Sequence, residues 1–434
     1  FTLCYIGGMS DDKLRLESQT LRPKNRLGTF EAFRIVNFRW FFSALVCNFA
    51  SMNIQMFVRG WLVFEITGSY EKLGWMTAAG GIVGLVAAPL GGVVADRVRQ
   101  KKTVLQLSGF ANAIVTLAMA YFIARGQLTF EHLLVASVMQ GLIMSAMMPA
   151  RQAITKDVVG IDLLTNAIAL TATGMNGTRL LLPGLAGGMV AALGGGTGNI
   201  EPAKWVYVMM TVLYITSAAT ILRVKLRDRM DTEISSGPMF EQMRAGFSYV
   251  LQTPIIFMLL GYNFLMAFFG MTYYMLLPGF VKEVLDAGPN KLGLIMSIAG
   301  FGSLAGSLVI ASLPGRNRAK VLLSGTLLMG VALLLFSLST HYWLSLALLT
   351  LVGLGSSARM SLSNVLIQTH VDDDFRGRVM SIHMLEMAVI SIGIFPVSVF
   401  ADIFGPQWAV GLSASCLVIL VLFLFTQPAY RDLD

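Results

Sequence analysis

Apolar runs as long as a membrane-spanning helix recur along almost the whole chain, and they constrain its fold more than any other feature. A helix needs about 20 residues to cross the hydrocarbon core of a bilayer. The runs are continuous rather than alternating, so a transmembrane β-barrel is not expected. We therefore predict an all-α membrane protein with twelve spans, at residues 38–66, 71–95, 103–124, 132–154, 164–193, 204–223, 254–280, 290–313, 320–339, 342–369, 378–402 and 406–427.

The composition agrees with this interpretation and excludes several other classes of protein. Only 13% of the 434 residues are charged, against about 25% in soluble proteins. The net charge of +8 does not indicate a nucleic-acid partner, because the bases lie between the spans rather than on one patch. Two of the three cysteines, Cys47 and Cys416, fall in spans, so neither a disulfide framework nor a metal site is expected. Zinc-enzyme and P-loop signatures are missing from the sequence, and we expect neither an enzyme nor a cofactor.

Basic residues gather in alternate connections between the spans. Connections rich in Lys and Arg stay in the cytoplasm, so we expect both termini to be cytoplasmic. The membrane expected to hold the protein is the bacterial inner (plasma) membrane. The opposite connections hold only Lys72, Arg125, Lys204, Lys282 and Lys291. The connections expected inside hold Arg97, Arg99, Lys101, Lys102, Arg151, Lys156, Arg223, Lys225, Arg227, Arg229, Arg316, Arg318, Lys320, Arg376 and Arg378.

The longest connection expected inside, residues 224–253, divides the spans into two sets of six. It is polar, and it ends in an amphipathic piece that we expect to form a short helix on the membrane surface. The predicted organisation is a cytoplasmic segment at 1–36, a six-helix bundle at 37–223, this linker at 224–253, a second six-helix bundle at 254–428 and a cytoplasmic tail at 429–434.

The two predicted bundles contain an internal repeat. Residues 73–101 align without a gap with residues 292–320. Parallel repeats of six helices predict two pseudo-symmetric halves with a substrate site between them, near the middle of the membrane. The alignment pairs Gly81 with Gly300, Arg97 with Arg316, Arg99 with Arg318 and Lys101 with Lys320, and it pairs Asp96 with Gly315.

The connection after the second span reads Gly92-Val-Val-Ala-Asp96-Arg97-Val-Arg99-Gln-Lys101-Lys102. An acid beside several bases at a helix end can form a charge network that opens as helices move. The segment resembles the loop between the second and third helices of the major facilitator superfamily, although Arg99 stands where a glycine is usual and Gln100 where an arginine is usual. The resemblance implies the major facilitator fold and alternating access, with Gly92, Asp96, Arg97 and Lys101 gating the inside face. The alternative is an ordinary cationic cytoplasmic loop.

The fifth span contains Asn176-Gly-Thr-Arg179-Leu-Leu-Leu-Pro183-Gly184-Leu-Ala-Gly187-Gly188. A proline removes a backbone hydrogen bond, and small residues give a helix a thin, closely packing face. The segment resembles the fifth helix of antiporter-type members of the superfamily, with Leu182 in place of a glycine and the spacing to the glycine pair one residue longer. We predict that Pro183, Gly184, Gly187 and Gly188 bend the helix, with close packing alone as the alternative.

Four further segments are Gly60-Trp-Leu-Val-Phe-Glu65-Ile-Thr-Gly68-Ser, Pro149-Ala-Arg151-Gln-Ala-Ile, Leu164-Thr-Asn166-Ala-Ile-Ala-Leu and Arg376-Gly-Arg378-Val-Met-Ser. They resemble the drug- and siderophore-exporting branch of the superfamily. The resemblance implies export of an amphipathic or cationic small molecule from the cytoplasm, driven by protons, by a protein that acts as a monomer in the bilayer. Alternatives are a dedicated siderophore or metabolite exporter, a lipid transporter and, from another class, a non-transporting membrane receptor or scaffold.

Ionisable residues within the spans are few, and such residues are functional candidates because a charge in a bilayer is costly. Glu386 is the one carboxylate well inside a span, and His383 lies one helical turn before it. We predict that this pair exchanges protons; the alternative is that Glu386 is a structural partner of an arginine. Arg59 and Arg359 are expected to bind an anionic group or to stabilise the acid, and Arg179 is expected to be structural.

Polar and aromatic side chains in several spans are candidates for a substrate cavity. The 26 methionines suit a site that accepts several ligand shapes, because the thioether is flexible and polarizable, although most of them are expected to face lipid. The predicted cavity residues are Asn48, Asn53, Gln55, Arg59, Gln140, Asn263, Tyr273, Tyr274, Arg359 and Asn364.

Overall fold

The computed structural model describes residues 30–97, 101–160, 163–196, 198–225, 239–313, 317–372 and 375–427. Within these residues the chain is helical apart from its connections and one isolated bridge between Gly196 and Asn199. The elements are η1 (Glu31–Arg34), α2 (Val36–Thr67), α3 (Tyr70–Arg97), α4 (Lys101–Ala124), α5 (Phe130–Val159), α6 (Leu164–Ala192), α7 (Ala203–Leu222), α8 (Met239–Gln252), α9 (Pro254–Glu283), α10 (Pro289–Ser312), α11 (Arg318–Leu338), α12 (Tyr342–His370), α13 (Arg376–His383), α14 (Glu386–Phe404) and α15 (Pro406–Thr426).

Several helix boundaries have a local cause in the sequence. α9, α10 and α15 begin at Pro254, Pro289 and Pro406, where a proline's missing N–H costs no helical hydrogen bond. α2 ends at Gly68, whose φ of 60° is left-handed and whose N–H donates to the Phe64 carbonyl at 2.8 Å. These signals explain why the observed ends fall close to the predicted ones.

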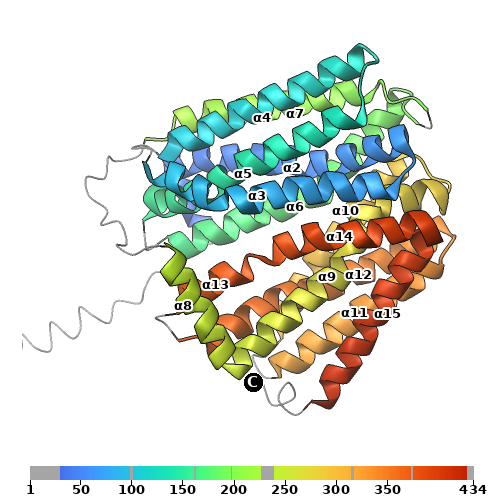
Figure 1. The fold of residues 1–434 in the computed structure, drawn as a ribbon. Coiled ribbons are helices and arrows are strands. Elements are labelled where there is room, and N and C mark those ends of the chain that lie inside the picture. The colour runs from blue at the N-terminus through green and yellow to red at the C-terminus, as the bar shows by residue number, and fades with distance from the viewer. Residues whose placement is uncertain are drawn as a thin grey trace, which may run out of the picture.

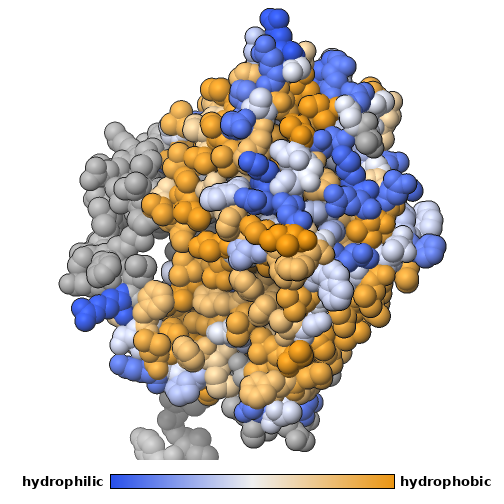
Figure 2. Space-filling model, turned by 45° about the vertical axis from the view of Figure 1, so that its right-hand side comes forward, coloured by the Kyte–Doolittle hydropathy of each residue, from blue (hydrophilic) through white to orange (hydrophobic). Residues whose placement is uncertain are grey.

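The described helices confirm the all-α, twelve-span fold. Ten segments are long and apolar enough to cross a bilayer, with α13 and α14 counted together as one segment. The remaining two spans are the glycine-rich helices α3 and α6, of 28 and 29 residues. Large apolar side chains such as Leu107, Ile114 and Leu117 are exposed on the flank of the bundle. Figure 2 shows one face of the molecule with a broad hydrophobic surface and with hydrophilic residues gathered mainly at the upper right, as expected of a lipid-embedded protein.

One predicted span requires a correction. Residues 378–402 were expected to form a single helix, but the structure interrupts it with a turn at Met384 and Leu385, between α13 and α14. Residues 378–392 around the turn have neither Gly nor Pro, so the local sequence does not signal a break there. His383 and Glu386, on either side of the turn, both hydrogen-bond to Asn263 of α9. The interruption therefore coincides with a tertiary contact that helical periodicity cannot reveal.

The helices form two packed groups, α2–α7 above and α9–α15 below in Figure 1. The groups meet mainly through two helix pairs, α3 with α14 and α6 with α10. The second spanning helix of each group thus packs on the fifth spanning helix of the other group. A pseudo-twofold axis between the groups produces this pattern. The aligned residues Gly74 and Gly293 both lie at these contacts, against Ser398 and Pro183 respectively.

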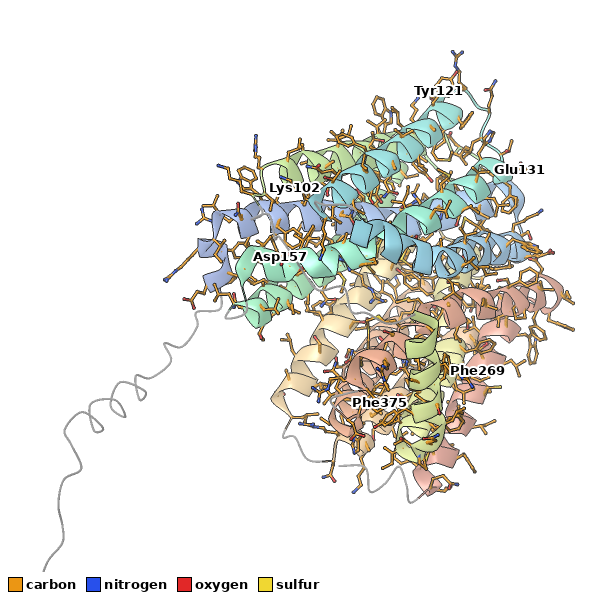
Figure 3. All side chains as sticks on the ribbon, turned by 60° about the vertical axis from the view of Figure 1, so that its left-hand side comes forward. Lys102, Tyr121, Glu131, Asp157, Phe269 and Phe375 are labelled. Atoms are coloured by element: carbon orange, nitrogen blue, oxygen red, sulfur yellow. The ribbon has the colours of Figure 1, made fainter. Side chains whose placement is uncertain are left out.

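Consecutive helices run up and down through the first group. Figure 3 places Lys102 and Asp157 toward one end and Tyr121 and Glu131 toward the other. The helix α8 lies in the connection between the groups and packs on the second one. Its Tyr249 ring stacks on Phe375 at 4.3 Å between centroids, and the Tyr249 hydroxyl donates to Asp372 Oδ2 at 3.1 Å.

Candidate functional site

A cavity of about 260 Å³ lies between the two groups of helices, and both groups line it. The first group contributes residues of α2, α3, α4, α5 and α7, and the second contributes residues of α9, α10 and α14. Seven methionines form much of the wall: Met52, Met56, Met76, Met144, Met147, Met275 and Met296. The polar lining consists of Asn48, Gln55, Arg59, Thr77, Asn112, Ser137, Gln140, Tyr214, Tyr274 and Ser391.

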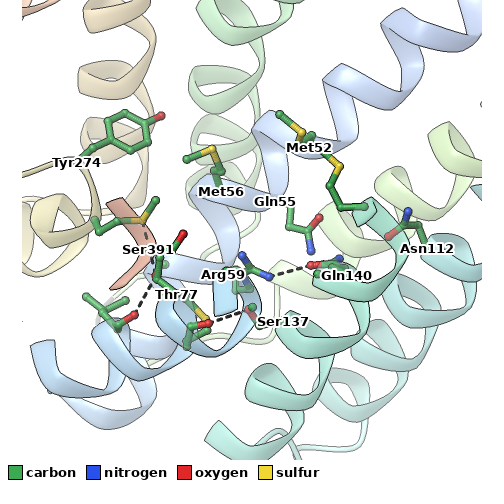
Figure 4. Close-up of a pocket in the computed structure, with 18 of the residues that line it drawn as sticks. Met52, Gln55, Met56, Arg59, Thr77, Asn112, Ser137, Gln140, Tyr274 and Ser391 are labelled. Atoms are coloured by element: carbon green, nitrogen blue, oxygen red, sulfur yellow. Dashed lines mark hydrogen bonds between the residues drawn. The ribbon is translucent and has the colours of Figure 1, made fainter. Parts of the chain in front are cut away.

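Arg59 is the one charged side chain that lines the cavity among the residues the structure describes. Its Nη1 donates to Gln140 Oε1 at 2.8 Å, so a residue of α2 is held by a residue of α5. Figure 4 shows Arg59 directed at Gln140, with Gln55 beside the pair. Gln140 Nε2 is buried and has no hydrogen-bond partner. Arg59 thus presents its remaining N–H donors and a positive charge to the cavity.

Methionine sulfurs accept weak hydrogen bonds from the polar lining. Asn48 Nδ2 donates to Met147 Sδ at 3.7 Å, and Thr77 Oγ1 donates to Met275 Sδ at 3.8 Å. The second contact joins the two groups of helices across the cavity. Polar and apolar parts of the wall are therefore interleaved, which suits a ligand that has both kinds of surface.

Half of the predicted cavity residues lie at this cavity: Asn48, Gln55, Arg59, Gln140 and Tyr274. The other five do not line it. Asn53 points to α6, where its Nδ2 donates to Thr178 Oγ1 at 3.2 Å. Tyr273 is buried in the hydrophobic core, and Asn364 accepts a hydrogen bond from Gln368 on its own helix. Asn263 and Arg359 belong to a separate buried cluster.

That cluster joins α9, α12 and the interrupted segment α13–α14. Arg359 Nη1 donates to Glu386 Oε1 at 2.8 Å and to Asn263 Oδ1 at 3.1 Å. Asn263 Nδ2 lies 2.8 Å from Glu386 Oε2 and 3.2 Å from His383 Nδ1. Ser363 Oγ donates to Asn263 Oδ1 at 3.2 Å. Both predicted proton-coupling residues, Glu386 and His383, are thus held in one hydrogen-bonded network.

The electrostatics of this cluster differ from those of the cavity. The Arg359 side chain is 2% exposed and that of Glu386 is 15% exposed, so the two charges offset each other in a largely buried place. The cluster does not line the cavity, but α14 connects the two, because Ser391 of the same helix lies on the cavity wall. A change at Glu386 can therefore reach the cavity through the position of α14.

Charged side chains also link the two groups at one end of the bundle, near the 193–202 and 284–288 connections. Glu65 accepts from Lys282 Nζ at 2.8 Å and from the Gly198 N–H at 2.6 Å. The Tyr70 hydroxyl donates to Glu283 Oε2 at 2.8 Å. The Asp402 carboxylate of α14 accepts from the N–H groups of Tyr70 and Glu71 and from the Ser69 hydroxyl, and so caps the start of α3. We call these contacts the end latch.

The sequence analysis contains Glu65 only as part of a motif at the end of the first span, and it does not include Asp402 or Glu283. Each of these acids lies close to the end of a span, and this is the one signal that the sequence offers for them. Such a position does not predict a contact with a residue more than a hundred positions away. The methionine wall was also missed as a set, because its members come from five helices.

The predicted helix-bending residues lie in α6, which is continuous through Pro183. The Gly184 N–H donates to Ser297 Oγ of α10 at 2.9 Å. A Cβ added at Gly187 would lie 2.4 Å from the Pro289 carbonyl oxygen, whereas one added at Gly188 would meet nothing within 4 Å. Gly184 and Gly187 therefore serve a close approach between the two groups, and Gly188 does not.

The predicted gating residues Gly92, Asp96 and Arg97 belong to the last turns of α3, and Lys101 begins α4. The side chains of Asp96 and Arg97 lie outside the described part of the structure, as does Arg99.

A twelve-helix bundle in two pseudo-symmetric groups, with a cavity between them, defines a membrane transporter. Comparison with known families identifies the transporter family to which the chain belongs. The model of the Major Facilitator Superfamily matches residues 41–385, and a second match covers residues 259–432. The chain belongs to this superfamily, which is made of transporters.

Similar proteins agree with this family. The Staphyloferrin A transporter of Staphylococcus aureus (strain NCTC 8325 / PS 47) is 22% identical over 89% of this chain and 96% of its own length. The Multidrug efflux pump Tap of Mycolicibacterium fortuitum is 24% identical over 91% of this chain and 96% of its own. Among solved structures, a mutant of the nucleoside transporter NupG superposes with a TM-score of 0.73 at 14% identity, covering 89% of this chain and 98% of that one. At this identity the likeness shows the fold alone.

Proposed function

We propose that the chain exports a small amphipathic molecule from the cytoplasm by alternating access, in exchange for protons, and that it acts as a monomer without a cofactor or a nucleic-acid partner. The observation that carries the proposal is the cavity between the two groups of helices, whose wall interleaves methionines with polar side chains. A wall of this kind can accept ligands of more than one shape, because methionine adapts its rotamers at little cost. The six-helix units proposed for this motion are 37–223 and 254–428.

The export direction depends on the orientation proposed from the basic connections. We expect a cysteine placed at Glu201, which is exposed in the 193–202 connection, to react with a membrane-impermeant maleimide added to whole cells. A cysteine placed at Lys102 should react only after the membrane is permeabilised. The native cysteines are replaced by serine in both variants. Labelling of Lys102→Cys but not Glu201→Cys in intact cells would reverse the orientation.

Alternating access also requires a gate at each end of the cavity. The end latch is the proposed outer gate, and Gly92, Asp96, Arg97 and Lys101 are the proposed inner gate. We expect Asp402→Asn to weaken the outer gate, because the α3 N–H groups then lose a charged acceptor. A reporter cysteine at Met56, on the cavity wall, should react faster from outside in this variant and more slowly in Asp96→Asn. Equal reactivity in both variants and in the parent would remove these residues from the gates.

Glu386 and His383 are the proposed proton-coupling residues. The support is the cluster in which a carboxylate, an imidazole and an arginine share one buried network beside an interrupted helix. Discontinuous helices are used by secondary transporters to hold ions and substrates. A carboxylate that exchanges its arginine partner for a proton as α14 moves would couple proton passage to the motion of the cavity wall.

Purified protein in liposomes loaded with the pH indicator pyranine tests the function directly. Ethidium, Hoechst 33342 and dansylglycine are added one at a time against an acidic lumen. We expect at least one compound to cause lumen alkalinisation that empty liposomes do not show. Compounds that accumulate without a pH change would argue for uniport, and a complete lack of accumulation would count against export of this class of molecule.

A second candidate function is dedicated export of one siderophore or metabolite. The likeness to a protein named Staphyloferrin A transporter favours it. The number of compounds transported in the liposome panel separates the two functions, because a dedicated exporter should reject most of the panel.

A further inference from the structure

We propose that the cavity recognises an anionic group through Arg59, and that the transported molecules are amphipathic anions rather than cations. The inference rests on the proposed transport function and specifies the charge of its substrate. The group expected at Arg59 is a carboxylate or a similar oxyanion, and the body of the molecule is expected to lie along the methionines.

The first observation is the hydrogen bonding of Arg59. Of its guanidinium nitrogens, only Nη1 makes a hydrogen bond within the described part of the chain, to Gln140 Oε1. Guanidinium N–H groups can only donate. The unused donors of Arg59 match the acceptor oxygens of a carboxylate, which an arginine can bind with two parallel hydrogen bonds.

The second observation is the missing counter-charge. Among the described residues, no Asp or Glu lines the cavity or lies within salt-bridge distance of Arg59. The buried arginine of the second group, Arg359, has Glu386 as its partner. A desolvated charge without a partner is costly. A bound anion would therefore offset the charge of Arg59, as Glu386 offsets the charge of Arg359.

The remaining wall indicates the rest of the ligand. Met52 and Met56 come from the same helix as Arg59 and line the same cavity, and Figure 4 shows them farther along that helix than Arg59. Thioethers pack against apolar and aromatic groups alike. A cationic ligand would instead meet the positive charge of Arg59 without a carboxylate in the described wall to offset it.

A matched set of fluorescent ligands tests the charge preference by binding alone. Dansylglycine carries a carboxylate, its methyl ester is neutral, and dansylethylenediamine carries an ammonium group on the same fluorophore. Titration of the purified protein in nanodiscs should give a dissociation constant for dansylglycine about ten- to hundredfold lower than for the ester, as expected for a charge-assisted hydrogen-bonded contact. The ammonium analogue should bind most weakly.

Variants then assign the preference to Arg59. Arg59→Gln should abolish the difference between dansylglycine and its ester, and Arg59→Lys should keep part of it, because lysine retains the charge but not the planar fork. Arg125→Gln, at an exposed arginine in the α4–α5 connection, should keep the full difference. Melting temperature and elution volume show that each variant is folded.

The inference is overturned if the parent protein binds the ester or the ammonium analogue as tightly as dansylglycine, a comparison that needs no variant. It is also overturned if the preference survives in Arg59→Gln. Transport of other compounds in liposomes without any preference for anions in binding would refute this inference alone. Anion preference in nanodiscs without transport of any compound would instead refute the proposed function.

Discussion

Proton-driven export is expected to disappear in Glu386→Gln, while binding of substrate in the cavity is retained. Glutamine keeps the size of the side chain but cannot be ionised or carry a transferable proton. The cavity should still bind substrate, because Glu386 does not line it. Binding measured in nanodiscs and accumulation measured in liposomes under a pH gradient separate the two effects.

Stability needs its own control in this experiment. Glu386→Gln leaves Arg359 without a charged partner in a buried place, and removing one member of a buried pair costs about 3–5 kcal/mol. The double variant Glu386→Gln with Arg359→Gln removes both charges and should recover part of that loss without recovering coupling. Glu386→Asp should retain some coupled export with a shifted pH optimum.

The opposite outcome has a defined meaning. If Glu386→Gln still concentrates substrate under a pH gradient, the proton passes elsewhere in the protein. Glu65 is then the next candidate, because it is a carboxylate in a largely buried ion pair that bridges the two groups. Sodium coupling or uniport would then also have to be tested.

A severe loss of transport is also expected in Gly187→Ala but not in Gly188→Ala. The two glycines are neighbours in one helix, so the change in helix propensity is the same. The Cβ at Gly187 would lie 2.4 Å from a backbone oxygen of α10, whereas the Cβ at Gly188 has open space. Overpacking of this kind costs about 1–3 kcal/mol, which changes a conformational equilibrium about five- to 150-fold.

Transport rate and outside reactivity of a cysteine at Met56 are the measurements for this pair. Gly187→Ala should separate α6 from α10, lower the transport rate and expose the reporter from outside. Gly188→Ala should be neutral, or stabilise the helix by up to about 1 kcal/mol. Similar losses in both variants would favour the prediction from the sequence that these glycines bend α6.

The spans were predictable from the sequence because their signal is local. A helix in hydrocarbon must satisfy its own backbone hydrogen bonds and expose apolar side chains. Length and hydropathy therefore mark it without knowledge of its neighbours. The internal repeat was predictable for a related reason. Gly74 and Gly293 occupy equivalent positions in the two repeats, and each permits its helix to approach the other group closely. The interruption at Met384 and Leu385 was not predictable, because it has no local cause.

The candidate site was only partly predictable. Hydropathy marks Arg59, Glu386 and Arg359 as costly residues in spans, but it does not say which of them have a partner. The structure pairs Arg359 with Glu386 and leaves Arg59 facing a cavity. Asn53 and Gln55 stand two residues apart on α2, yet one binds α6 and the other lines the cavity.

The sequence by itself thus determined the class of fold, the positions of the spans and the short list of costly polar residues. Each of these follows from the free energy of placing a residue in a bilayer, which depends on the residue and its near neighbours in the chain. Only the tertiary structure decided which charges offset each other, which methionines form one wall and which acid latches the two groups together. Those contacts join residues such as Tyr70 and Asp402, and their energies depend on the packing of helices that lie far apart in the sequence.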